Sequence, residues 1–177
     1  MTIRALTLDD LEPYLVHLAA HGAESGRDGD VYFGPYGREH PLPVDEVRER
    51  TRERWAKPLD IPCWRRAWGG FDGDRIVSSA SVAGGELPTG LHRVTLGMSV
   101  LRGHRRRGWG RRLLGVVVAW CRSQPSVAWL DLGVFADNLP ARALYERAGF
   151  EVIGETRDRW RLDGHRVDEI AMTLPVE

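Results

Sequence analysis

Lysine is almost absent from this chain: of the 25 lysine and arginine residues among 177 amino acids, Lys57 is the only lysine. The formal net charge is zero, which argues against nucleic-acid binding, because such binding needs a net or one-sided positive field. No segment approaches the roughly 20 apolar residues of a membrane span. The N-terminus also lacks the basic and apolar regions of a signal peptide. We therefore expect a cytoplasmic protein with neither a membrane nor a nucleic-acid partner.

Cysteine is scarce as well. Cys63 and Cys121 lie far apart, and neither has a second Cys or His at metal-ligand spacing, so we expect no disulfide framework and no metal site. Hydrophobic residues make up 42% of the chain, as in ordinary globular proteins. A chain of this length suits one compact domain over residues 1–177.

The first half of the chain predicts a short strand, two helices and a three-stranded antiparallel meander. In chain order, the predicted elements are 2–8, 9–21, 43–55, 63–71, 75–83 and 91–100. Turn residues at 72–74 and 84–90 separate the three strands of the meander. Residues 22–43 are rich in Gly, Pro and Asp without clear periodicity, so we expect a long irregular loop there.

The second half predicts a helix, a strand, a helix and a closing hairpin. Trp109, Leu113 and Trp120 recur at helical spacing within 108–122 and mark one buried face. A strand over 127–135 and a helix ending at Gly149 follow, and Asp163-Gly164 is typical of a two-residue hairpin turn. The predicted class is a mixed α/β sheet with a largely antiparallel first half, one βαβ crossover and a C-terminal hairpin, unlike a doubly wound parallel sheet.

The run Arg105-Arg106-Arg107-Gly108-Trp109-Gly110-Arg111 joins a predicted strand to a predicted helix. Unpaired N–H groups and the dipole favour an anion at a helix N-terminus, and the two glycines let the backbone approach it closely. A Rossmann fingerprint would need glycine at Leu113, and a P-loop would need Gly-Lys-Ser or Gly-Lys-Thr. The run therefore predicts another kind of pyrophosphate site, with an exposed arginine-rich loop as the plain alternative.

This run resembles the acetyl-CoA loop of the GNAT superfamily of N-acetyltransferases, which reads Gln or Arg, two residues, Gly, any residue, then Gly or Ala. The preceding strand, 96–100, also matches the superfamily. The segment from Asn138 to Phe150 resembles its Asn-x-x-Ala-x-x-Leu-Tyr-x-x-x-Gly-Phe block. The resemblance extends from about residue 91 to 172 and before that rests on element order. It implies an acyl-CoA N-acyltransferase fold with acetyl-CoA as co-substrate.

The resemblance also implies residue roles. Backbone groups of Met98, Ser99 and Val100 would pair with the pantetheine arm. Amides of the loop would hold the pyrophosphate, namely those of Arg105, Arg106, Arg107, Gly108, Trp109, Gly110 and Arg111. Asn138 and Tyr145 are seven residues apart, so both lie near one helix face. Asn138 would contact the cofactor and also cap its helix, and Tyr145 would be the general acid for the departing thiolate.

An acceptor amine is mostly protonated at neutral pH, so transfer needs a base or a water chain. Many relatives carry a glutamate at the position of Thr95, which cannot act as a base. Glu86, His92 and His104 are nearby candidates, although such residues are more often solvated surface residues than catalysts. His92 is the tentative base because it adjoins the strand. The oxyanion would be stabilised by backbone N–H groups of residues 96–100.

These features predict an N-acetyltransferase that moves an acetyl group directly, in a ternary complex, to a primary amine. The acceptor would be a small molecule, an amino acid or a protein N-terminus, bound along residues 22–43 and the second helix. Thr95 keeps a second hypothesis open, a CoA-binding sensor or interaction protein with little or no turnover. Nucleic-acid binding through residues 102–112 ranks below both. Exposed sheet edges, through which relatives often dimerise, leave a homodimer open.

Overall fold

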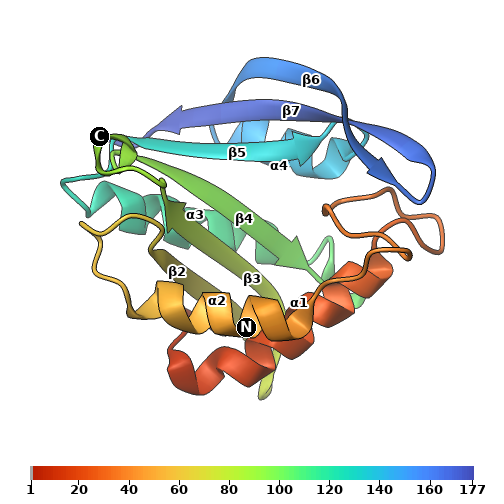
Figure 1. Ribbon diagram of the computed structural model, residues 1–177, viewed down its shortest axis with the longest axis horizontal. Helices are drawn as coiled ribbons and strands as arrows, with labels where there is room; N and C mark the ends of the chain where they lie inside the picture. Colours follow the sequence, from red (N-terminus) through yellow and green to blue (C-terminus); the bar gives the residue numbers. More distant parts are fainter. Residues whose placement is uncertain (1) are drawn as a thin grey trace.

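A computed structural model describes residues 2–177. Seven strands form one mixed sheet in the order β1-β2-β3-β4-β5-β7-β6, with helices on both faces (Figure 1). The strands are β1 Thr2–Ala5, β2 Arg65–Asp72, β3 Arg75–Gly84, β4 Arg93–Val100, β5 Trp129–Phe135, β6 Glu151–Leu162 and β7 His165–Pro175. The helices are α1 Leu11–Glu24, α2 Val44–Ala56, α3 Trp109–Arg122 and α4 Leu139–Arg147. The predicted class and element order are confirmed.

The predicted boundaries shift where local chemistry competes with the strand or helix. The first strand ends at Ala5 because Leu8–Asp10 forms a 3₁₀ turn before α1. The carboxylate of Asp10 accepts a hydrogen bond from the Thr7 amide at 2.9 Å and pairs with Arg4 at 2.6 Å. Such a capped turn satisfies N–H groups that would otherwise be unpaired, so it interrupts the extended chain.

Two layers of helices enclose the sheet. Leu113 and Val117 of α3 pack on Val94, Leu130 and Met172, all of them almost fully buried, and this is the main core. The helices α1 and α2 cover the opposite face and join through a smaller apolar cluster of Leu11, Leu15 and Val47. The sheet therefore has an α3 face and an α1/α2 face.

The central strands β4 and β5 form a fork. They are the only parallel pair in the described residues, and they pair over three positions, from Arg93 with Trp129 to Thr95 with Asp131. Beyond Thr95 the two strands diverge, and Figure 1 shows the wedge between them. On its other side β4 stays paired with β3 as far as Val100. The fork thus opens the middle of the sheet along the second half of β4.

Candidate functional site

The fork exposes backbone hydrogen-bonding groups on β4. The Leu101 amide donates to the Val77 carbonyl at 3.0 Å, so odd-numbered residues of β4 direct their backbone groups toward β3. Backbone groups alternate sides along a strand, and Met98 and Val100 therefore face the fork. The Val100 carbonyl accepts from Arg105 Nε at 3.1 Å. Both groups of Met98 and the N–H of Val100 are left directed into the wedge.

The loop after β4 gathers further N–H groups. Arg106 and Gly108 have left-handed backbones, with φ of 59° and 83°, and Gly108 is the N-cap of α3 without a side-chain cap. The first helical hydrogen bond runs from the Arg112 amide to the Gly108 carbonyl at 3.1 Å. Amides before Arg112 therefore point beyond the helix end. Left-handed residues at a helix start form a concave anion site.

The side chain of Trp109 anchors this loop to the core. Its side chain is buried, and a Cβ added at Gly70 of β2 would lie 2.7 Å from its ring. The indole therefore belongs to the core, and only the Trp109 backbone is available to a ligand. In contrast, Arg106, Arg107 and Arg111 are exposed, so their guanidinium groups form a basic rim around the amides.

The backbone amide of Arg105 does not have the role that we predicted, which was to hold a pyrophosphate. Its amide donates to the Arg102 carbonyl at 3.2 Å, and its guanidinium pairs with Glu24 at 3.0 Å and Asp30 at 2.8 Å. Arg102 also pairs with Asp30, at 2.9 Å. These groups tie the loop to the end of α1 and to the segment after it, so Arg105 positions the loop and has no amide to offer an anion.

Asn138 and Tyr145 lie on α4, beside the second arm of the fork. Asn138 Oδ1 accepts from the Ala141 amide at 3.3 Å, so the predicted cap is confirmed, and its NH₂ group remains for other contacts. Tyr145 is 8% exposed and its ring packs on Phe150. Burial raises the pKa of Tyr145 to about 12, so its hydroxyl stays protonated at neutral pH and can act as a donor.

The side chain of Ser99 faces α1 rather than the fork. Its Oγ lies 2.7 Å from Nε2 of His17 and 2.8 Å from the Ser79 hydroxyl, and all three side chains are buried. Burial lowers the pKa of His17 to about 4. The neutral imidazole therefore holds the end of β4 against α1, and any ligand contact of Ser99 is limited to its backbone.

None of the sequence-derived base candidates reaches the end of β4 that lines the fork. His92 is exposed and precedes β4, six residues and about 20 Å of extended chain before Met98. His104 pairs with Asp72 at 3.2 Å at the turn between β2 and β3, and Glu86 is exposed in the loop between β3 and β4. His92 is therefore poorly placed for the role that we expected of it.

The sequence reasoning missed Glu169 of β7. Its carboxylate lies over Gly133 of β5, because a Cβ added there would be 2.9 Å from the carboxyl carbon. It accepts a hydrogen bond from Trp160 Nε1 at 3.0 Å and is a quarter exposed. Gly133 continues β5 beyond the last pair with β4. A carboxylate therefore lies beside the fork on the α1/α2 face.

The long loop between α1 and α2 is attached to the C-terminal hairpin. The Asp163 carboxylate accepts hydrogen bonds from the Tyr32 hydroxyl at 3.0 Å and from the amides of Arg38 and Glu39 at 2.8 and 3.2 Å. In Figure 1 the loop lies next to the tip of the hairpin of β6 and β7. Together these segments form a wall at the open end of the fork.

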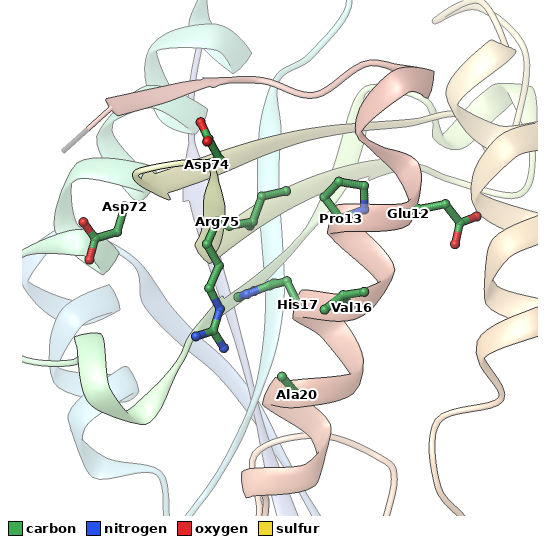
Figure 2. A pocket seen from close by; sticks show the side chains of 9 residues that line it. Glu12, Pro13, Val16, His17, Ala20, Asp72, Asp74 and Arg75 are labelled. Carbon is green, nitrogen blue, oxygen red and sulfur yellow. The ribbon is translucent and has the colours of Figure 1, made fainter.

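A separate cavity of about 620 Å³ lies between α1 and the turn joining β2 and β3 (Figure 2). Pro13, Val16 and Ala20 line it from α1, opposite Asp74 and Arg75. These positions are on the side of α1 away from Leu11 and Leu15, which contact α2. The cavity is therefore not part of the fork.

A fork beside a glycine-bearing helix start, with a basic rim and a buried tyrosine, suits transfer of an acyl group from a phosphate-bearing carrier. The model of the acetyltransferase (GNAT) family matches residues 36–150, and the chain belongs to that family. It is thus an acyltransferase of the GNAT type. The predicted superfamily is confirmed.

Three individual proteins show how similar the chain is to known relatives and structures. The chain is 28% identical over 133 residues to an L-amino acid N-acetyltransferase, AaaT, of Escherichia coli (strain K12), covering 75% of this chain and 77% of that protein. The fold matches the putative acetyltransferase yncA of Salmonella typhimurium, solved with acetyl-CoA, with a TM-score of 0.81 at 16% identity over 100% and 94% of the two chains. It also matches a ribosomal-protein-alanine N-acetyltransferase of Brucella melitensis, with a TM-score of 0.76 at 20% identity over 99% of each. Within residues 2–177 no helix is long and apolar enough to cross a membrane.

Proposed function

We propose that the protein transfers an acetyl group from acetyl-CoA to a primary amine within a ternary complex. The observation that carries this proposal is the fork, whose unpaired groups on Met98 and Val100 lead directly to the N-terminus of α3. An extended arm ending in a pyrophosphate has the chemistry to use both. Acetyl-CoA would supply the activated thioester.

The chain would bind such a donor mainly through its backbone. Met98 would pair with the pantetheine arm as an added strand does, while the amides from Arg106 to Arg111 would hold the pyrophosphate. Exposed guanidinium groups on the rim would add charge-assisted contacts. The free NH₂ group of Asn138 would contact the donor from α4.

The reaction itself requires two proton transfers and stabilisation of an oxyanion. The backbone N–H of Val100 faces the fork and is the proposed oxyanion donor. Glu169, replacing His92 as the proposed base, would take a proton from the acceptor ammonium, directly or through one water. Tyr145, which remains protonated, would donate to the departing thiolate.

The amino acid acetyltransferase among the relatives makes free amino acids the first acceptors to assay. Binding of acetyl-CoA measured by isothermal titration calorimetry should give a micromolar dissociation constant. Thiol release with amino acids, other amines and peptides then reports turnover. Binding without turnover on any acceptor would favour the sensor hypothesis, and no binding at millimolar acetyl-CoA would contradict the proposal.

The role of Glu169 is tested by Glu169→Gln, which keeps the size of the side chain and removes its basicity. We expect turnover to fall by about 10²- to 10⁴-fold, the range of general base catalysis, with unchanged acetyl-CoA binding. Glu155→Gln is the matched control, because Glu155 is exposed on the adjacent strand β6. Equal turnover in both variants would remove Glu169 from the mechanism.

A further inference from the structure

Arg65, the first residue of β2, is half-buried without an acidic partner. Its Nε is shielded from solvent and makes no hydrogen bond, and no ion pair involves it within residues 2–177. The titratable groups that act most strongly on its charge are Tyr14, Tyr36, Arg50 and Arg54, none of which is a carboxylate. A guanidinium cannot escape burial by losing its proton, so an unpaired one is costly to the fold.

Three other partly buried arginines have acceptors. Arg66, the next residue, donates to the Lys57 carbonyl at 2.7 Å. Arg93 pairs with Asp131 at 2.6 Å, and Arg105 pairs with Glu24 at 3.0 Å. Arg65 differs from these three arginines, because its buried Nε has no acceptor.

The position of Arg65 connects it to the fork. Arg65 is opposite Ala83 of β3, which is opposite Thr95 of β4, so the three share the α1/α2 face. Thr95 and the following residue on this face, Gly97, are exposed, so helices leave the centre of the sheet uncovered there. A ligand lying on this part of β4 can extend toward Arg65.

Tyr14 of α1 lies between Arg65 and the part of the sheet next to the fork. Its side chain is buried, and its phenol interacts with Ser81 and with the charge of Arg65. Ser81 is opposite Gly97 in the sheet, and a Cβ at Gly97 would lie 3.3 Å from Ser81 Oγ. Arg65 and Tyr14 therefore lie on the face of the sheet that carries Thr95 and Gly97, beside Met98.

We propose that Arg65, together with Tyr14, binds a carboxylate of the acceptor, so that the substrates are amines that carry a carboxylate. The inference rests on the proposed acetyl transfer and adds the chemical class of its acceptor. Arginine suits this role because its planar fork binds both oxygens of a carboxylate. Arg50 and Arg54 of α2 add positive potential at Arg65.

Matched acceptors test the selectivity. The wild-type protein should acetylate L-leucine with kcat/KM at least about 100-fold above that of 3-methylbutylamine, which lacks only the carboxylate. Without a carboxylate, this amine cannot form the charge-assisted hydrogen bonds that the site offers. Arg65→Met should reduce this preference to a few-fold, with unchanged KM for acetyl-CoA. Arg52→Met, at an exposed position of α2, should retain it. Equal rates for both acceptors in the wild type, or full selectivity in Arg65→Met, would overturn the inference.

A thermal measurement separates the failure of this inference from the failure of the proposed function. N-acetyl-L-leucine should raise the melting temperature of the wild-type protein, and N-(3-methylbutyl)acetamide should not. Without ligand, Arg65→Met should melt a few degrees higher than the wild type, because it removes a half-buried cation that has no acidic partner. If no amine is acetylated, the proposed function fails, and the carboxylate-dependent shift still decides the role of Arg65. A lower melting temperature in Arg65→Met, together with a retained shift, would assign Arg65 to structure alone.

Discussion

Replacing Gly108 with valine tests whether the start of α3 binds the donor. Gly108 has φ of 83°, and a Cβ there meets no atom within 4 Å. The valine side chain would therefore project into open space in the free protein, in the region assigned to the pyrophosphate. The change should damage binding far more than packing.

Gly29 provides a matched control, because it has φ of 84° and equally open surroundings, in the loop after α1. A left-handed conformation costs an ordinary residue about 1–2 kcal/mol. For a chain of this size this lowers the melting temperature by roughly 2–8 °C. We expect Gly29→Val and Gly108→Val to share this loss, since the backbone strain is the same.

Only Gly108→Val should lose affinity for acetyl-CoA, by about 100-fold or more, because loss of two or three charge-assisted N–H contacts to phosphate costs several kcal/mol. Isothermal titration at constant ionic strength measures this difference, and thermal unfolding measures the shared strain. Equal affinity in the two variants would refute the assignment of the pyrophosphate to this loop.

Three further outcomes are expected. Tyr145→Phe should lower kcat by up to about 10²- to 10⁴-fold with little change in acetyl-CoA affinity, and unchanged kcat in steady-state assays would exclude a donor role. Arg105→Gln should lower the free energy of unfolding by about 1–2 kcal/mol in urea titrations, since it breaks two ion pairs that are about a quarter exposed; an unchanged midpoint would show that these pairs contribute nothing. The pKa of His17 is lowered by burial to about 4, so below about pH 6.5 the unfolded chain binds a proton that the folded chain does not, and stability falls as pH drops from 6.5 toward 4. When the pH falls from 7 to 5, the free energy of unfolding of His17→Gln should decrease by about 2 kcal/mol less than that of the wild type. Equal decreases in the two proteins would show that another group dominates.

The fold was largely predictable because its signals are local. The helical period of Trp109, Leu113 and Trp120 and the Asp163-Gly164 turn fix their elements within a few residues of sequence, and both elements are found as expected. The fork was not predictable. Where a parallel pair ends depends on the register and twist of strands far apart in the chain, and no residue pattern reports it.

The site residues also divide into those with local sequence signals and those without. Gly108, Asn138 and Tyr145 belong to short motifs, and they lie at the start of α3, at the start of α4 and within α4. Glu169 and Arg65 belong to no motif, since alternation on a strand gives the face of a side chain but not its neighbours on other strands. The one signal for Glu169 was its place on a strand of the C-terminal hairpin, where it had no reason to stand out from the adjacent charges.

The short pairing of β4 and β5 would make a donor bound in the wedge a structural part of the sheet. An arm bound in the wedge would act as the missing length of strand between the two halves of the molecule, and the Met98 and Val100 amides would lose their contact with water. Amide hydrogen exchange at these two positions would then follow each stage of the catalytic cycle, fast in the empty enzyme and slow while the arm remains bound. The sheet would then be completed and opened again with every turnover.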